Sequence, residues 1–251
     1  MCLILVAYQH HPTYRLVFAA NRDEFYDRPA APAAFWKENP NVLAGKDLLK
    51  GGTWCGITKT GRFAALANIR DPKGHRDGTP SRGLLVSNFL KGKESPEEYL
   101  KKIKEEALQY NPFGLLVSDL SSLFYFSNRM GKTQKLGPGL YGLSNHFLDT
   151  PWPKVKRGKE KLKAILSQES FSTQDLLKLL EDKTPAPDSE LPDTGVGLEL
   201  ERMLSPIFIE SPSDGTRIST VLRIHQNNEM IFFEKNPLSN KTQEFHFDMS
   251  N

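Results

Sequence analysis

Long hydrophobic runs and cysteines are both scarce in this sequence. The longest apolar run near the start covers residues 2–7, which is shorter than a signal-peptide core, and no stretch approaches the roughly 20 apolar residues of a membrane span. We therefore expect no transmembrane segment and a cytoplasmic protein, although the composition leaves a cleaved organelle signal open. Two cysteines, Cys2 and Cys55, provide no disulfide framework, which indicates a reducing compartment.

The sequence also lacks a large excess of positive or negative charge. The 33 Lys and Arg residues against 30 Asp and Glu residues leave a net charge of +3, which is too small to indicate a nucleic-acid partner. The six histidines are scattered without i, i+4 spacing, so we expect no metal site. A chain of 251 residues suits one large globular domain, or two small ones at most, and we expect a single domain over residues 1–251.

The hydrophobic pattern predicts strands at both ends of the chain and helices in between. The expected strands cover residues 3–7, 16–20, 53–58, 63–68, 114–118, 123–127, 206–210, 220–225, 230–234 and 243–247. The expected helices cover residues 81–90, 95–107, 155–166 and 172–180. Ser95 is the candidate N-cap of the second helix, and either Ser172 or Thr173 is that of the fourth. Three prolines within residues 182–193 predict a loop.

This order of elements favours an antiparallel α+β architecture over alternating βαβ units. Two hairpin-rich groups of strands and two groups of helices predict a four-layer αββα sandwich of antiparallel sheets.

Cys2 is the first candidate for chemistry, because it directly follows the initiator methionine. Small second residues generally permit removal of that methionine, which would make Cys2 both a thiol and the N-terminal amine. The amine titrates near pH ~8 and the thiol near ~8.5, so the amine can accept the thiol proton close to neutral pH. The alternative is that Cys2 is a small buried hydrophobic residue.

Polar residues at the ends of expected strands are further candidates. On a continuing strand, Asn21 and Asp23 would face one side while Arg22 and Glu24 faced the other. These side chains could form surface salt bridges or contribute to a site. Before Trp54, two glycines indicate either a turn feeding a core strand or a close backbone approach to a ligand.

Asn68, Asn145 and Arg217 also lie at the edges of apolar segments. Turn chemistry explains many such asparagines, and the functional alternative is that they are fixed donors for an oxyanion, a carboxylate or a thiolate.

Several sequence blocks occur together in the order and spacing of one known family. They are residues 1–4, 21–24, 51–54, 81–86, 141–145 and 215–221. With these blocks the sequence resembles the NRDE family, also called the transport and Golgi organisation protein 2 family, from residue 1 to about residue 225.

The resemblance implies a fold similar to the N-terminal nucleophile hydrolases, in particular their penicillin and bile-salt acylase branch. It implies these candidate catalytic residues: Cys2 as nucleophile, Arg22 and Asp23 as a strand pair, Asn68 and Asn145 as amide donors, and Arg217 as a late arginine. Asn21, Trp54, Ser144 and His146 are the expected substrate-binding residues. The acylase pattern separates its Arg and Asp by two residues, but Arg22 and Asp23 are adjacent and cannot both point into one site from a regular strand, so we expect Asp23 to point inward.

These residues predict a hydrolase that acts on an amide or other acyl bond of a small molecule and needs no cofactor. A retained Met1 would bury the amine in a peptide bond and remove the base. The alternative function is non-catalytic binding and trafficking of haem, an acyl lipid or acyl-coenzyme A on the same scaffold. Haem propionates could then bind arginines such as Arg22 or Arg217.

A basic run covers residues 154–163, with Glu160 as its one acidic member. Such runs are usually the solvated face of a helix. The functional alternative is peripheral contact with an anionic partner, either the phosphates of an acylated cofactor or an acidic membrane surface.

Overall fold

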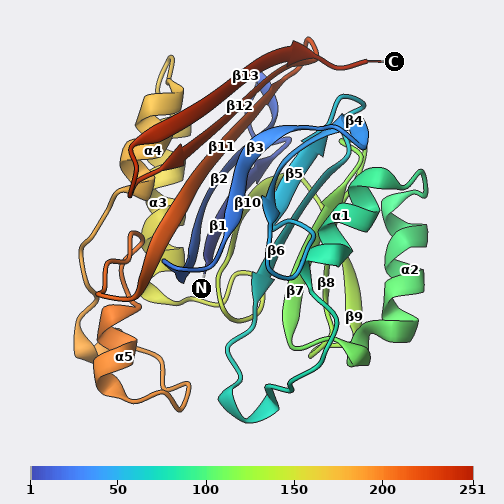
Figure 1. Ribbon diagram of the computed structural model, residues 1–251. Coiled ribbons are helices and arrows are strands. Elements are labelled where there is room, and N and C mark those ends of the chain that lie inside the picture. Colours follow the sequence, from blue (N-terminus) through green and yellow to red (C-terminus); the bar gives the residue numbers. More distant parts are fainter. Residues whose placement is uncertain (1, 251) are drawn as a thin grey trace.

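Two antiparallel sheets face each other in the computed structural model, which describes residues 2–250, and helices cover the outer face of each sheet (Figure 1). Helices α3 (Pro153–Leu166) and α4 (Thr173–Leu180) cover the sheet that contains the N-terminal strand. Helices α1 (Gly83–Lys91) and α2 (Pro96–Glu106) cover the other sheet. The four-layer αββα arrangement expected from the order of elements is therefore confirmed.

The first sheet has six strands in the order β10-β1-β2-β11-β12-β13. Their bounds are Gly139–Leu143 (β10), Cys2–Tyr8 (β1), Tyr14–Phe25 (β2), Asp214–His225 (β11), Glu229–Asn236 (β12) and Lys241–Asp248 (β13). In this sheet β1 pairs with β2 on one side and with the edge strand β10 on the other, so Cys2 begins a strand that is not at the edge of the sheet.

The second sheet has seven strands in sequence order from β3 to β9. Their bounds are Ala30–Trp36 (β3), Asn39–Asp47 (β4), Cys55–Thr58 (β5), Phe63–Asn68 (β6), Phe113–Ser118 (β7), Leu123–Ser127 (β8) and Lys132–Leu136 (β9). The helices are Gly83–Lys91 (α1), Pro96–Glu106 (α2), Pro153–Leu166 (α3), Thr173–Leu180 (α4) and Leu198–Met203 (α5). Short 3₁₀ helices cover Pro72–Gly74, Ala107–Gln109 and Asp188–Glu190.

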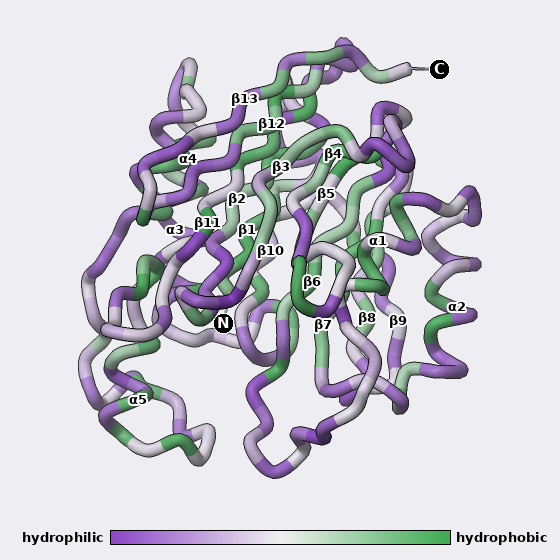
Figure 2. The backbone as a smooth tube through the Cα atoms, viewed as in Figure 1, coloured by the Kyte–Doolittle hydropathy of each residue, from purple (hydrophilic) through white to green (hydrophobic). Residues whose placement is uncertain are grey.

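Alternation along the strands assigns each side chain to a layer, since successive residues of a strand point to opposite faces. On β2, Leu16, Phe18 and Ala20 pack between the sheets, whereas Val17 and Ala19 pack against α3 and α4. Hydrophobic residues accordingly concentrate along the central strands, and the outward side of α2 is hydrophilic (Figure 2).

Local capping explains where two of the predicted helices begin. The Ser95 side chain accepts the Glu98 N–H while the Glu98 carboxylate accepts the Ser95 N–H, and Ser172 and Asp175 form the same capping box before α4. Ser95 is therefore confirmed as an N-cap, and of the two candidates for α4 the N-cap is Ser172.

Some predicted elements differ from the structure. Residues 206–210, predicted as a strand, form only an isolated bridge between Glu210 and Gly215. Strand β3 was not predicted, because its sequence is rich in alanine and contains Pro32; it is an edge strand, where a residue without an N–H is tolerated. Within residues 2–250, no helix has the length and apolar character needed to cross a membrane.

Candidate active site

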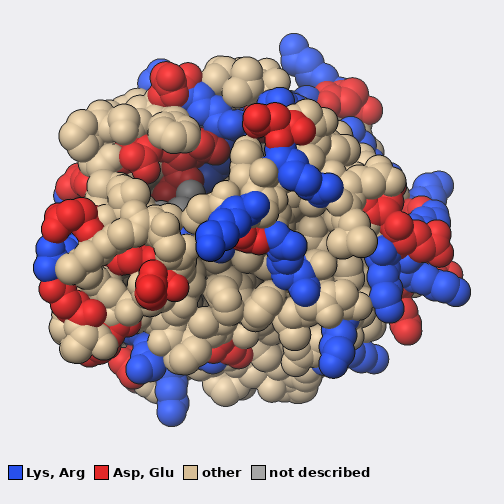
Figure 3. Space-filling model, turned by 90° about the horizontal axis from the view of Figure 1, so that it is seen from below, with Lys and Arg blue, Asp and Glu red and all other residues tan. Residues whose placement is uncertain are grey.

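A cavity of about 290 Å³ opens at the end of the sandwich where β1 begins, β2 ends and α1 begins. Side chains of β1, β2 and β6, the loop after β4 and the segment 75–83 line it, and Cys2, Arg22, Asp23, Trp54, Leu66 and Asn68 are among them. Seen from this end, the molecule has a hollow bordered by acidic and basic side chains (Figure 3). Five of the predicted site residues therefore share one cavity.

Cys2 is the first residue of β1, and its side chain packs against the core between the sheets. Its carbonyl accepts a hydrogen bond of 2.9 Å from the Ser144 hydroxyl, and the backbone N–H of Asp23 bonds to its sulfur. Burial raises the pKa of the Cys2 thiol. The thiol is therefore held in place but needs a base to become a nucleophile. Met1, whose removal the proposed chemistry requires, lies outside the described residues.

The end of β2 corrects the expected orientation of Arg22 and Asp23. Arg22 is on the same face of β2 as Phe18 and Ala20, and its guanidinium lies over the Trp54 ring, 4.5 Å from the ring centroid. Asp23 is on the opposite face, and its carboxylate accepts a hydrogen bond of 2.7 Å from the Thr216 hydroxyl. Arg22 is thus the residue that points between the sheets, although both residues line the cavity.

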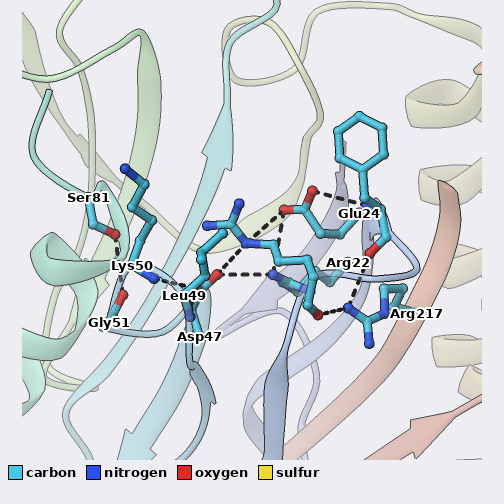
Figure 4. Close-up of polar contacts among 10 residues, drawn as sticks. Arg22, Glu24, Asp47, Leu49, Lys50, Gly51, Ser81 and Arg217 are labelled. Atoms are coloured by element: carbon cyan, nitrogen blue, oxygen red, sulfur yellow. Dashed lines mark hydrogen bonds and ion pairs between the residues drawn. The ribbon is translucent and has the colours of Figure 1, made fainter. Parts of the chain in front are cut away.

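A group of ion pairs around Asp47 forms one wall of the cavity (Figure 4). The Asp47 carboxylate lies 2.7 Å from Arg28 Nε and 3.3 Å from Arg22 Nη2, and Glu24 lies 3.5 Å from both arginines. Burial by itself raises the pKa of Asp47, but the hydrogen bonds from Arg28 and the Lys50 N–H outweigh it and leave that pKa below its usual value. This wall therefore holds two cations and two anions. No sequence pattern singled out Asp47 or Arg28.

Lys154 is a buried neighbour of Asp23. It belongs to the basic run that was expected on the solvated face of a helix. Its side chain is almost fully buried, at 2% exposure, and among the described residues its Nζ has no hydrogen-bond partner. Burial lowers the pKa of Lys154 and raises that of Asp23, while each charge opposes the shift of the other. The helical periodicity could have predicted this burial. Lys154 is four residues before the buried Gly158 and eight before Leu162, so all three lie on one face of α3.

The two predicted amide residues meet beside Cys2. Asn145, which is buried, donates a hydrogen bond of 2.9 Å from its Nδ2 to the backbone carbonyl of Asn68. Asn68 lies at the end of β6 and lines the cavity. Ser144 contacts this region through its hydroxyl bond to the Cys2 carbonyl. The ends of β1, β6 and β10 thus bring three distant sequence blocks together.

The glycine pair before Trp54 allows a close backbone contact. Gly52 has a φ of +78°, and a side chain there would lie only 2.3 Å from the carbonyl carbon of Gly83. The Thr53 N–H also donates a bond of 3.1 Å to the Gly83 carbonyl. This contact fixes the first turn of α1 against the loop that carries Trp54, so both line the same cavity.

Five predicted residues do not line the cavity: Asn145 and Ser144, whose contacts are given above, and Asn21, His146 and Arg217. The Asn21 amide donates to the carbonyls of Leu180 and Ile207, at 2.8 and 2.9 Å, which ties β2 to the helix layer. His146 Nδ1 lies 2.8 Å from the Thr150 hydroxyl. Arg217 donates to the Phe25 and Arg28 carbonyls (Figure 4) and is the extra residue of a bulge in β11.

The basic run at residues 154–163 is less available to an anionic partner than its composition indicated. Asp182 lies 2.6 Å from Lys161 and 3.7 Å from Arg157, and Asp149 lies 2.7 Å from Lys159. Both aspartates lie in loops that flank the helices, and these pairs neutralise half of the six basic residues. Among residues 2–250, no group of three or more His, Cys, Asp and Glu side chains is placed to hold a metal ion.

Comparison with known sequences identifies relatives over almost the whole chain. The family model described as Transport and Golgi organisation 2 matches residues 1–239. A Transport and Golgi organization 2 homolog from Mus musculus is 35% identical over 264 residues, covering 96% of this chain and 95% of the relative. A Homo sapiens homolog is 36% identical over 257 residues, covering 94% of this chain and 92% of the relative.

Solved structures share the fold at low sequence identity. The mutant C2A conjugated bile acid hydrolase from Clostridium perfringens matches with a TM-score of 0.59 and 11% identity, covering 100% of this chain and 94% of that one. A Caenorhabditis elegans ortholog of N-acylethanolamine-hydrolyzing acid amidase matches with a TM-score of 0.51 and 12% identity, covering 88% of this chain and 92% of that one. The expected N-terminal nucleophile hydrolase-like fold is thereby confirmed.

Proposed function

This chain belongs to the transport and Golgi organisation 2 family, and from that premise and the cavity geometry we propose that it is an N-terminal-cysteine hydrolase acting on an amide or other acyl bond of a small molecule. The observation that carries the proposal is the position of Cys2, which starts β1 and lines the cavity beside Arg22 and Asn68. The two named hydrolases that share this fold support it.

The proposed reaction starts with removal of Met1, which frees the Cys2 amine. The amine accepts the thiol proton, and the sulfur attacks the acyl carbon to form a tetrahedral oxyanion. The Asn68 amide and a backbone N–H would hold that oxyanion. The amine then returns the proton to the leaving group, a Cys2 thioester remains, and water hydrolyses it to the free acid and the thiol.

The Asp23 carboxylate and its neighbours have a supporting part in this scheme. The Asp23 N–H bonds to the Cys2 sulfur, and its buried carboxylate interacts with the Lys154 charge. A carboxylate in this position would hold the freed amine of Cys2 and keep its lone pair directed at the thiol.

The direct test is to trap the acyl-enzyme. Protein without Met1 is mixed with a panel of acyl p-nitroanilides of different chain lengths, quenched in acid and weighed by intact-mass spectrometry. We expect the mass of one acyl group on Cys2 and release of nitroaniline over many turnovers. Cys2→Ala should abolish both signals, and the matched variant Cys55→Ala should retain them, because the Cys55 thiol is buried and outside the main cavity.

Asn68→Ala tests the oxyanion step separately. We expect turnover to fall by about 100- to 1,000-fold, the usual effect of losing one oxyanion donor, with an unchanged midpoint of thermal unfolding. Unchanged turnover in this folded variant would remove Asn68 from the mechanism. Stoichiometric acyl-compound or haem binding that survives Cys2→Ala, without turnover by wild-type protein, would favour the carrier function instead.

A further inference from the structure

The arginines that line the cavity differ in their partners. On the wall formed by β2 and the loop after β4, Arg22 and Arg28 both contact the Asp47 carboxylate, and Glu24 lies near both. These arginines already have anionic partners from the chain itself. A ligand anion would have to compete with those carboxylates.

Arg82 also lines the cavity, directly before the first turn of α1. Its guanidinium donates one hydrogen bond of 2.8 Å to the Pro112 carbonyl, and within residues 2–250 no carboxylate forms an ion pair with it. The side chain is partly buried, so solvent screens its charge only in part. An arginine has five N–H donors, and a single carbonyl acceptor uses one of them and does not neutralise the positive charge of the guanidinium.

The surroundings of Arg82 add positive charge. Arg76, on the exposed rim, donates to the carbonyls of Leu108 and Tyr110, and Lys50 also lines the rim. The acidic residue of that rim, Asp77, is fully exposed and lies 3.5 Å from His75. Burial lowers the pKa of Arg82, and negative charge on Cys2 or Glu24 would oppose that shift. Arg82 and Cys2 both line this cavity.

We propose that Arg82 binds an anionic group of the substrate, a carboxylate, sulfonate or phosphate, while Cys2 attacks the acyl bond of the same molecule. The inference rests on the proposed function and names its substrate class as acidic acyl compounds. The planar guanidinium suits this task, because its parallel N–H groups match the two oxygens of such an anion. Trp54 and Leu66 supply the apolar part of the lining.

The test uses two thiol reagents of equal length and opposite charge on the Cys55→Ala protein, in which Cys2 is the remaining thiol. They are 2-sulfonatoethyl and 2-(trimethylammonio)ethyl methanethiosulfonate. The Cys2 thiolate attacks the sulfenyl sulfur, a mixed disulfide forms and methanesulfinate leaves, so no oxidant is needed. The measured quantity is the ratio of the two labelling rates, which reports the electrostatic potential at Cys2 without requiring turnover.

We expect Arg82→Gln to lower the anionic-to-cationic rate ratio about tenfold, the effect of one unit charge about 6 Å from either reagent charge in water. Arg82→Lys keeps the charge and should retain most of the ratio. Arg15→Gln is the matched control, because Arg15 also donates to one carbonyl but lies at the other end of β2, and it should leave the ratio unchanged.

An unchanged ratio in a folded, labelled Arg82→Gln protein would overturn the anion site while leaving the hydrolase proposal intact. A ratio that falls as expected, in a protein that hydrolyses nothing, would retain the anion site and reject the hydrolase. If Arg82→Gln does not fold, sodium sulfate decides with wild-type protein. The sulfonate reagent should label Cys2 more slowly in sodium sulfate than in sodium chloride of equal ionic strength, because sulfate would compete for the anion site. Equal labelling rates in the two salts would reject the site.

Discussion

The two faces of the end of β2 satisfy their polar groups in different ways. On the inner face, the charges of Arg22 and Glu24 are balanced by Asp47 and Arg28. On the outer face, the neutral Asn21 amide bonds to fixed backbone carbonyls. The outer face therefore anchors the strand to the helix layer, whereas the inner face presents charges whose balance a ligand can alter.

We expect the largest loss of stability from a substitution on the outer face. Asn21→Ala should lower the free energy of unfolding by about 3 kcal/mol, because it leaves the buried carbonyls of Leu180 and Ile207 and the Ser219 hydroxyl without a partner. Urea unfolding measures the change, and the exposed Asn227→Ala provides the control at under about 1 kcal/mol. Equal losses in both variants would contradict an anchoring role for Asn21.

Asp47→Asn should have the next largest effect, about 2 kcal/mol at pH 7, because two arginines lose their shared carboxylate. The folded pKa of Asp47 lies below its unfolded value, so its stabilisation is present above the unfolded pKa of about 4 and disappears as pH falls through the folded pKa. Unfolding curves of wild type and variant should therefore converge in acid. A difference that persists below both pKa values would show that the charge of Asp47 is not its source.

The buried charges of Asp23 and Lys154 should be coupled by about 1 to 2 kcal/mol. Asp23→Asn, Lys154→Met and the double variant form a double-mutant cycle, measured by urea unfolding at neutral pH. Additive changes would contradict a charge–charge interaction between the two side chains in the folded protein.

Glu24→Gln should have the smallest effect, under about 1 kcal/mol, because this carboxylate is more exposed than Asp47 and lies 3.5 Å from each arginine. The loss should shrink further in 1 M salt, where exposed charges are screened. A loss as large as that of Asp47→Asn would mean that the two carboxylates contribute equally to the inner face.

Local sequence signals determined most elements of the fold. Alternating or continuous apolar runs identified β1, β2, β6 and β8, and Ser95 and Ser172 identified two helix starts. These features depend on neighbouring residues along the chain, so a sequence can encode them directly. The edge strands β3 and β9 have no such pattern, because the first contains alanine and proline and the second is mostly polar and exposed.

The family resemblance of the sequence also grouped Cys2, Arg22, Asp23, Trp54 and Asn68 with Asn145 and Arg217 as site residues, and all but the last two line one cavity. Only the tertiary structure decided how the charged groups are placed: Arg22 points between the sheets, Lys154 is buried beside Asp23, and among residues 2–250 no carboxylate forms an ion pair with Arg82. The physical reason is that burial and ion pairing depend on partners distant in sequence. Asp47 reaches Arg22 from another sheet, and no local pattern specifies that contact.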